Sequence, residues 1–430
     1  MIESLGKLEK LSTHILDRSG CVHFTFEHNA YYRLPRTTVL LHILLVNTHP
    51  GHHCIITDKD LESALPGLDV TDPESLAAVA DRLELGLIDL SRPLELDPVY
   101  IAKPWGREIW YSGIERRGVS TVNGTPLSWL LDIFGRHLGC PKEPMLLKIL
   151  DPFPEPNLGD LYFEMHEHKV EVYVVTHVDE ASWPEGIGRI RYGFNQERLS
   201  GYDSTAQFLK AYIDSVNEYR AVRVEIDERL TRLHPVAPLN PAKYKELMKQ
   251  VPDELKQKEV QLRELMYEFT STRDLVVGDV ITVAPFVPHS LQRGVRVIEF
   301  QTPHYERYIL SFGQKVLTQD HWDTEKALDL AITDDIDFEP PRAIRPGQDL
   351  VADFKEFQVT RVRLSPGETT QYHPAGYAII IGVTGETELK TDNSSVTITP
   401  EAAFFVAPAD ELEFNVGSST TGCILIAEEC

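Results

Sequence analysis

The chain has 430 residues, of which 42% are hydrophobic and 25% charged, the composition of a globular protein. At about 100–200 residues per domain, this length predicts about two to four domains, with cores large enough to need neither disulfides nor a structural metal. Acidic residues outnumber basic residues by 66 to 42, which gives a formal net charge of -24. This charge disfavours nucleic acid and anionic membranes as partners.

The amino-terminal segment and the cysteines indicate the compartment. The opening sequence MIESLGKLEK lacks the apolar stretch of a signal peptide. The longest apolar run, residues 39–46, is far shorter than the roughly 20 residues of a membrane span. The cysteines are odd in number and have no CxxC spacing, which fits a reducing compartment. We therefore expect a cytoplasmic protein without a membrane segment.

Residues 1–98 are predicted to form a small α+β domain of unknown role. Strand-like runs at residues 21–26, 39–46 and 54–57 precede a segment with helical spacing over residues 74–85, for which Asp72 or Thr71 can supply the N-cap. The segment HPGHH at residues 49–53 is more typical of an exposed turn than of a metal site.

Residues 99–332 are predicted to form a second domain, built on short apolar strands that Pro- and Gly-rich turns separate. These strands are interrupted at residues 204–232 and 241–268, where the apolar residues recur with a helical period. The many charged residues of the two segments are typical of a solvated face. A helical insertion at about residues 204–268 in a β domain is the simplest account.

Residues 345–430 follow an acidic linker and consist almost wholly of predicted strands and turns, a pattern that indicates a sandwich or barrel. The sequence Val-Ala-Pro follows an apolar strand both at residues 283–285 and at residues 406–408, which favours two copies of one fold. The fold class we expect is therefore mainly β, with two β-barrels and a small N-terminal α+β domain.

The segment GDLYFEMHEHKVEVYVV, residues 159–175, carries the clearest chemistry. Side chains alternate between faces along a strand, so Glu164 and His166 point the same way, and a turn can return Glu171 beside them. Mixed nitrogen and oxygen ligands suit zinc or another divalent first-row metal. The alternative is an edge strand on which His166 and His168 are solvated.

A second segment, GDVITVAPFVPHSLQRG at residues 278–294, can supply a further ligand. A Gly-Asp turn leads into a strand, and a turn bounded by prolines then presents His289. The alternative is a turn histidine that caps its own loop. The two segments together favour a metal site.

These residues resemble the metal-binding hairpins of the cupins, and among cupins those of type I mannose-6-phosphate isomerase, a zinc enzyme. Other stretches are similar to that family in the same order along the chain: residues 103–106 (KPWG), 144–150 (PMLLKIL), 168–171 (HKVE), 299–307 (EFQTPHYER) and 321–330 (HWDTEKALDL). The resemblance covers about residues 100–430 and implies two cupin barrels. It also implies that Glu164, His166, Glu171 and His289 hold the metal, which is Zn²⁺ in that family, with Fe²⁺, Mn²⁺ or another divalent ion as alternatives.

The resemblance implies roles for five further residues. Lys169 and Glu299 correspond to groups that transfer protons or position substrate, and Arg307 to the cation that faces the developing enediolate. Lys148 would lie near the end of the pocket that receives the phosphate of the substrate, and Tyr162 takes the place of a serine that helps to bind it. For the first three residues there are structural alternatives: Lys169 as a solvated lysine of the turn, Glu299 as a structurally paired glutamate and Arg307 as a surface arginine.

The chain departs from the family at three points of the site. Glu164 stands where the family has glutamine, only four residues separate His166 from Glu171, and Tyr162 replaces the serine. These changes leave metal binding intact and leave open whether the sugar substrate is phosphorylated.

The function that the resemblance implies is a metal-dependent aldose–ketose isomerase of carbohydrate metabolism, acting on a small sugar or sugar phosphate. One alternative is an iron cupin dioxygenase, in which His166, His289 and Glu171 form a two-histidine, one-carboxylate face. The other is a sugar-binding cupin without catalysis. The C-terminal barrel keeps His373 without further ligands, so we expect it to hold no metal. Barrel edges and the acidic surface permit a homodimer.

Overall fold

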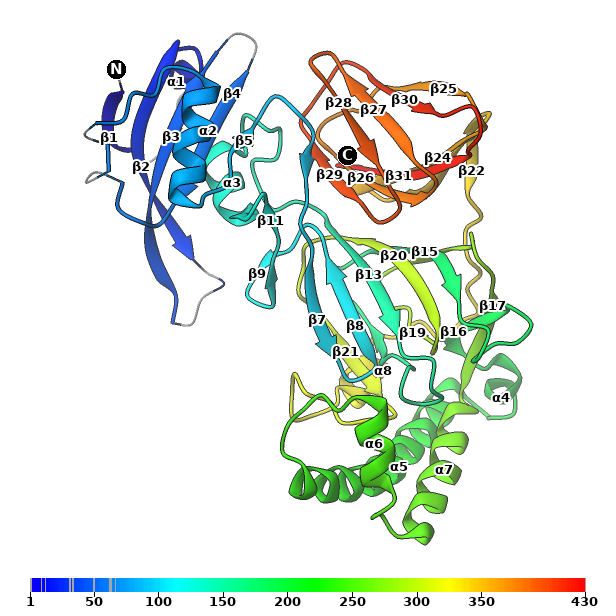
Figure 1. Cartoon of the computed structure of the whole chain (residues 1–430). Helices are drawn as coiled ribbons and strands as arrows, with labels where there is room; N and C mark the ends of the chain where they lie inside the picture. Colours follow the sequence, from blue (N-terminus) through cyan, green and yellow to red (C-terminus); the bar gives the residue numbers. More distant parts are fainter. Residues whose placement is uncertain are drawn as a thin grey trace. The chain divides into compact units, whose positions relative to one another are not determined.

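A computed structural model describes residues 2–429, apart from residues 9, 12, 31, 33, 34, 49, 50, 62, 63 and 66. Strands make up 39% and helices 20% of the structure, which confirms the mainly-β class (Figure 1). The chain forms two compact units: residues 1–99, 110–147 and 341–430 make unit 1, and residues 100–109 and 148–340 make unit 2. The boundaries at residues 98, 332 and 345 stay predictions. Within the described part of the chain, we find no helix with the length and apolar character of a membrane span.

The first sheet of unit 1 lies near the amino terminus and runs in the order β1-β2-β3-β4-β5. Its strands are β1 (Glu3–Leu8), β2 (Gly20–Ala30), β3 (Thr37–Asn47), β4 (His52–Thr57) and β5 (Ile88–Asp89), and the short helix α1 (Thr13–Leu16) precedes β2. Helix α2 (Pro73–Leu83) begins after Asp72, whose side chain accepts a hydrogen bond from the backbone of Ser75. It ends two residues earlier than predicted, because Glu84 adopts a left-handed conformation with φ 54°.

Of the segment HPGHH, His52 and His53 begin strand β4 and are half-buried rather than exposed, and residues 49 and 50 lie outside the described part. The ring of His52 bonds to the side chain of Asn47, with Nδ1 and Oδ1 2.9 Å apart. His53 Nε2 lies 3.3 Å from Asp89 Oδ2. Both described histidines therefore have polar partners of their own within this sheet.

Residues 110–147 of unit 1 contain short ladders and one helix. The elements are β9 (Ile114–Glu115), β10 (Gly118–Val119), β11 (Thr121–Val122), β12 (Thr125–Pro126) and α3 (Leu127–Phe134). Every residue of α3 except Asp132 is buried. Asp132 Oδ2 lies 2.8 Å from His28 Nδ1 on β2, and Trp129 Nε1 donates a hydrogen bond to the hydroxyl of Tyr32. These contacts attach α3 to the first sheet.

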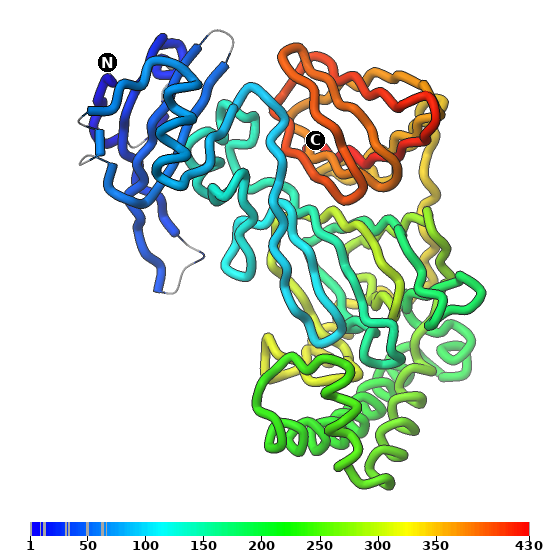
Figure 2. Tube along the Cα trace, viewed as in Figure 1, coloured from blue at the N-terminus to red at the C-terminus, as the bar shows by residue number. Residues whose placement is uncertain are grey.

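The C-terminal part of unit 1 consists of two facing sheets with a common apolar core (Figure 2). One sheet runs β22-β23-β24-β31-β26-β29-β6 and the other β25-β30-β27-β28. Strand β6 (Leu94–Glu95) comes from the N-terminal region and pairs with β29. The remaining strands are β22 (Arg342–Arg345), β23 (Gln348–Asp353), β24 (Phe357–Leu364), β25 (Thr369–Tyr372), β26 (Ala378–Thr384), β27 (Thr387–Thr391), β28 (Ser394–Ile398), β29 (Ala403–Val406), β30 (Leu412–Val416) and β31 (Gly422–Glu429).

Unit 2 is also built on two facing sheets. One runs β18-β15-β20-β13-β8-β7 and the other β17-β16-β19-β14-β21. The strands are β7 (Val99–Lys103), β8 (Gly106–Trp110), β13 (Leu146–Pro152), β14 (Phe163–Met165), β15 (Glu171–Val178), β16 (Gly188–Phe194), β17 (Thr270–Leu275), β18 (Val280–Val283), β19 (His289–Leu291), β20 (Val295–Gln301) and β21 (Tyr308–Ser311). Buried residues of both sheets share one core, so the unit is a barrel-like double sheet of the kind expected.

The helices of unit 2 fall mainly between β16 and β17. They are α4 (Gln196–Ser200), α5 (Thr205–Leu233), α6 (Pro241–Met248), α7 (Asp253–Tyr267) and, after β21, α8 (Thr324–Leu328). Apolar residues of α5 such as Phe208 and Tyr212 pack with Phe163 and Phe194 of the sheet. The helical period predicted over residues 241–268 is realised as two helices, α6 and α7, because Pro252 cannot donate the backbone hydrogen bond of a helix interior.

Candidate metal centre and active site

The two predicted metal-binding segments meet in unit 2. Strands β14 and β19 are antiparallel neighbours, and their register places Glu164 opposite His289, although 125 residues separate them. His166 follows Glu164 by two positions and therefore shares its face. One ligand atom from each of Glu164, His166 and His289 lies within 4.8 Å of the other two.

The ring nitrogens of the two histidines are oriented by the backbone. His166 Nδ1 lies 2.8 Å from the carbonyl oxygen of Glu306, and His289 Nδ1 lies 2.9 Å from that of Val287. A carbonyl oxygen can only accept, so each Nδ1 carries a proton, and in a neutral ring Nε2 then keeps a free lone pair. Both Nε2 atoms are buried, and neither has a hydrogen-bond partner among the residues that the structure describes. This is the arrangement of metal-ligating histidines, whose other nitrogen donates to a fixed oxygen.

Glu171 approaches the same point from β15. Its Oε1 lies 2.7 Å from His289 Nε2 and 3.3 Å from His166 Nε2, and it accepts a hydrogen bond from the hydroxyl of Tyr173. Its Oε2 lies 2.6 Å from Lys169 Nζ. Burial alone would raise the pKa of Glu171, but the charge of Lys169 holds that pKa well below its usual range. Glu171 is therefore an ionised carboxylate at the centre.

The protonation state of His166 also suits a ligand. Its side chain is 1% exposed, and this burial, together with the nearby charge of Lys169, lowers its pKa. His166 is thus a neutral imidazole near pH 7. Two imidazoles and two carboxylates form a donor set that fits Zn²⁺, Fe²⁺ or Mn²⁺, and the two buried Nε2 atoms fit a bound cation.

Glu299 and Lys148 form a second buried pair beside the first. Glu299 lies on β20 next to β15, and its Oε2 is 3.2 Å from Lys148 Nζ on β13. Burial raises the pKa of Glu299 well above its usual range, Lys148 opposes that rise, and the negative charge of Glu171 adds to it. A carboxyl group whose pKa is raised in this way can hold a proton and release it, as a general acid–base group must.

Arg307 and Tyr162 lie on the Glu164 side of the centre. Arg307 Nε is 3.4 Å from Glu164 Oε2, and the guanidinium carbon lies 4.4 Å from the centroid of the Tyr162 ring. Although burial opposes its charge, Glu164 raises the pKa of Arg307, which stays a cation. Burial raises the pKa of the Tyr162 phenol, which stays protonated.

The structure thus brings all nine predicted site residues into one region of unit 2. It also places there a pair that the sequence analysis did not single out: Lys103 and Glu108 are both buried, with Nζ and Oε2 3.1 Å apart. The charge of Glu108 acts on the pKa of both Tyr162 and Arg307. The Lys103–Glu108 pair therefore lies on the same side of the centre as Tyr162 and Arg307. The sequence feature that could have revealed this pair is the position of the two charged residues on either side of Trp105.

Glu306 was also missed, and it shapes the turn that follows His166. Its carboxylate accepts hydrogen bonds from the backbone N–H groups of Glu167 and His168. Its carbonyl group orients His166. One residue therefore fixes both the ligand ring and the hairpin that leads to Glu171.

Comparison with solved structures identifies the fold. The chain matches the mannose 6-phosphate isomerase from Bacillus subtilis with a TM-score of 0.52 and 14% identity, over 78% of this chain and 99% of that one. The apo form from Salmonella typhimurium matches with a TM-score of 0.51 and 12% identity, and a zinc-bound mannose 6-phosphate isomerase with 0.52 and 11%, each over the same shares of the two chains. This chain has the cupin fold of the mannose 6-phosphate isomerases.

The solved structures confirm the resemblance that the sequence motifs indicated. No protein-family model matches the chain, and no curated protein matches it either. At 11–14% identity the likeness to the isomerases shows the fold, and the chemistry rests on the residues of the site.

Proposed function

We propose that the protein is a metal-dependent aldose–ketose isomerase for a small sugar or sugar phosphate. Glu164, His166, Glu171 and His289 would hold a divalent ion, most simply Zn²⁺. The observation that carries the proposal is the set of oriented, unpartnered His166 and His289 nitrogens next to an ionised Glu171, together with a separate proton-holding group, Glu299.

The other charged residues fit the steps of such an isomerisation. The reaction moves a proton between neighbouring carbons through an enediolate, so it needs a proton carrier and a nearby positive charge. The bound ion would supply Lewis-acid polarisation of the substrate oxygens. The Glu299 carboxyl group would take up and return the proton, with the Lys148 ammonium 3.2 Å away. Lys169 and Arg307 would position the substrate and offset the developing negative charge.

The test is proton NMR of the zinc-loaded protein in deuterated water with mannose 6-phosphate and, separately, with mannose. We expect the ketose to appear while the C2 proton of the aldose exchanges for deuterium. The Glu299→Gln variant should bind the metal normally and lose at least about a hundredfold in rate, because general acid–base groups contribute at this scale. Full metal occupancy with saturable sugar binding and no exchange would instead assign a sugar-binding protein.

A second function follows from one specific feature of the centre. The Glu171 carboxylate touches the rings of both His166 and His289, which makes a two-histidine, one-carboxylate set typical of non-haem iron oxygenases. Dioxygen consumption by iron-loaded protein, with no sugar isomerisation, would select this function. The ammonium group of Lys169 next to Glu171 favours the isomerase.

A further inference from the structure

A groove of unit 2 lies apart from the residues of the proposed active site. It runs between one face of α5 and the connection from β21 to α8, and encloses about 470 Å³. Arg220, Val224 and Glu228 succeed one another along α5 at its wall, and Lys315 and Trp322 come from the connection. A cavity of this size lies in the range that binds small organic ligands.

The groove has an excess of positive charge in a strongly acidic protein. None of the three cations Arg220, Arg232 and Lys315 forms an ion pair with a carboxylate in the part of the chain that the structure describes. Of the carboxylates in its lining, Asp227 is bound to Arg223, whereas Asp320 contacts only the exposed imidazole of His321, so Asp320 and Glu228 remain as negative charges. Two carboxylates thus face three cations, which leaves the lining with one positive charge in excess.

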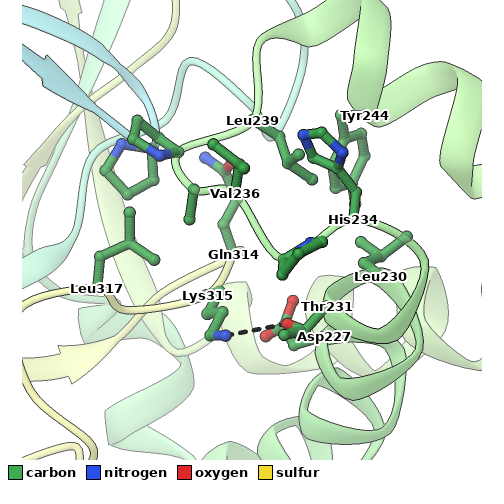
Figure 3. Close-up of a pocket in the computed structure, with 14 residues that line it drawn as sticks. Asp227, Leu230, Thr231, His234, Val236, Leu239, Tyr244, Gln314, Lys315 and Leu317 are labelled. Atoms are coloured by element: carbon green, nitrogen blue, oxygen red, sulfur yellow. Dashed lines mark hydrogen bonds between the residues drawn. The ribbon is translucent and has the colours of Figure 1, made fainter.

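A buried guanidinium lies in the lining of the same groove. Arg223 is 1% exposed, donates from Nε and from one terminal nitrogen to Asp227, and donates from the other terminal nitrogen to the hydroxyl of Tyr244. Three of its five N–H groups are used in this way. Figure 3 shows the adjoining cavity, where Lys315 bonds to Thr231 close to Asp227.

The wall beside these cations is apolar and aromatic. Trp322 is half-buried, and the Arg220 guanidinium lies over its ring, 5.6 Å from the centroid. Val224 on α5 is 45% exposed. A planar organic group could stack on such a surface while its charged end reaches the cations.

We propose that this groove binds a small phosphate monoester whose organic part is planar. Arginine and lysine recognise phosphate oxygens through charge-assisted hydrogen bonds, and the tryptophan face accounts for the planar part. The cations and the aromatic ring come from α5 and from the connection before α8, so the ligand would join these two elements.

The groove is linked to the proposed active site through that connection. Thr318 lies within it, and its Oγ1 accepts a hydrogen bond from a terminal nitrogen of Arg307. Arg307 Nε in turn lies 3.4 Å from Glu164. A ligand that fixes the connection would thereby fix Arg307. This consequence rests on the proposed function, and it predicts a change of KM for the sugar rather than loss of kcat.

The binding test uses AMP, with inorganic phosphate as the anion alone, titrated into the full chain by calorimetry. We expect saturable binding of AMP, tighter than that of phosphate. The double variant Arg220→Gln/Lys315→Gln should weaken AMP binding at least about tenfold, because two charge-assisted contacts are lost. Trp322→Phe should reduce the preference for AMP over phosphate. The control Arg229→Gln, on the same helix but outside the groove, should bind as the unaltered chain does.

Three results would overturn the proposal: no saturable binding of AMP, equal binding by the double variant, or an equal loss in Arg229→Gln. If Lys148→Met abolishes the binding and the double variant retains it, the ligand binds in the active site, and this result also contradicts the proposal. Circular dichroism of each variant checks that it is folded. These titrations contain no sugar, so their outcome does not depend on isomerase activity. Absence of that activity would refute the proposed function and would leave the inference about the groove unaffected.

Discussion

Two backbone carbonyl groups determine which nitrogen of each site histidine faces the centre. The carbonyls of Glu306 and Val287 take the Nδ1 protons of His166 and His289, so both Nε2 atoms are acceptors. Each would otherwise be a buried polar atom without a partner, at a cost of about 1–3 kcal/mol. A bound cation removes that cost.

At this scale we predict that His166→Ala and His289→Ala each lose at least about a hundredfold in zinc affinity, because changes outside the ligand shell already cost about 10–100-fold. The matched control is His168→Ala, whose side chain is 72% exposed two residues from His166. Metal content after dialysis, measured by mass spectrometry, checks this. Normal metal content in both ligand variants, or equal loss in the control, would contradict the assignment.

A second residue-scale prediction concerns thiols. Burial raises the pKa of Cys21 to about 11 and that of Cys140 to about 12, and it also raises the pKa of Cys54. The thiolate is the reactive form, and at pH 8 a thiol with a pKa of 11 is ionised about once in a thousand molecules. These thiols should therefore react slowly with Ellman's reagent at pH 8 and faster as the pH rises.

The measurement uses a chain in which Cys423 and Cys430 are replaced by serine, so that the three buried thiols give the whole signal. Full reaction after denaturation provides the control for thiol content. Rapid reaction of all three in the folded protein at pH 8 would show that these cysteines are not buried as described.

At the scale of elements, helix α5 contains two ion pairs with the same spacing and different burial. Arg223 and Asp227 are 1% and 14% exposed, with their atoms 2.6 Å apart, and Arg229 and Glu225 are 41% and 50% exposed at 2.8 Å. A buried ion pair leaves an uncompensated charge when one partner is removed, whereas an exposed pair is largely replaced by water.

We therefore predict that Arg223→Met lowers the free energy of unfolding by about 3 kcal/mol, and that Arg229→Met lowers it by no more than about 0.5 kcal/mol. Urea unfolding followed by circular dichroism measures both. Similar losses in the two variants would show that burial does not distinguish these pairs.

At the scale of the whole molecule, the candidate centre joins both sheets of unit 2. Glu164 and His289 belong to β14 and β19 of one sheet, His166 directly follows β14, and Glu171 belongs to β15 of the other sheet. A metal held by this set cross-links the two sheets in the folded state. Folding and metal binding are therefore coupled, because an unfolded chain cannot offer the same set of ligands.

This coupling predicts that zinc at about a hundredfold excess over its dissociation constant stabilises the protein by about 2.7 kcal/mol. Removal of the metal with a chelator should lower the melting temperature, and added zinc should restore it. The double variant His166→Ala/His289→Ala provides the control, since its melting temperature should respond to neither addition. An equal chelator effect in both proteins would place the stabilising metal elsewhere.

The organisation of unit 1 shows what local patterns could not predict. Helix α3 is buried on nearly every side, and so short an apolar run does not distinguish a helix from a buried strand. Strand β6 has two residues and pairs with β29, more than 300 residues away in sequence. Both features depend on partners from distant parts of the chain. The sequence analysis therefore missed them, although the strands β2, β3 and β4 follow from their own apolar runs.

The sequence by itself determined the local features of this protein: the mainly-β class, an N-cap at Thr71 or Asp72, and the shared face of Glu164 and His166. These depend on composition, on a cap three residues from its partner and on a two-residue alternation. Tertiary structure alone decided that Glu164 lies opposite His289, that Lys148 pairs with Glu299 and that Glu306 orients His166. Those contacts join segments more than 100 residues apart. Strand register and burial determine which charged groups pair with each other, and no local sequence pattern encodes either of them.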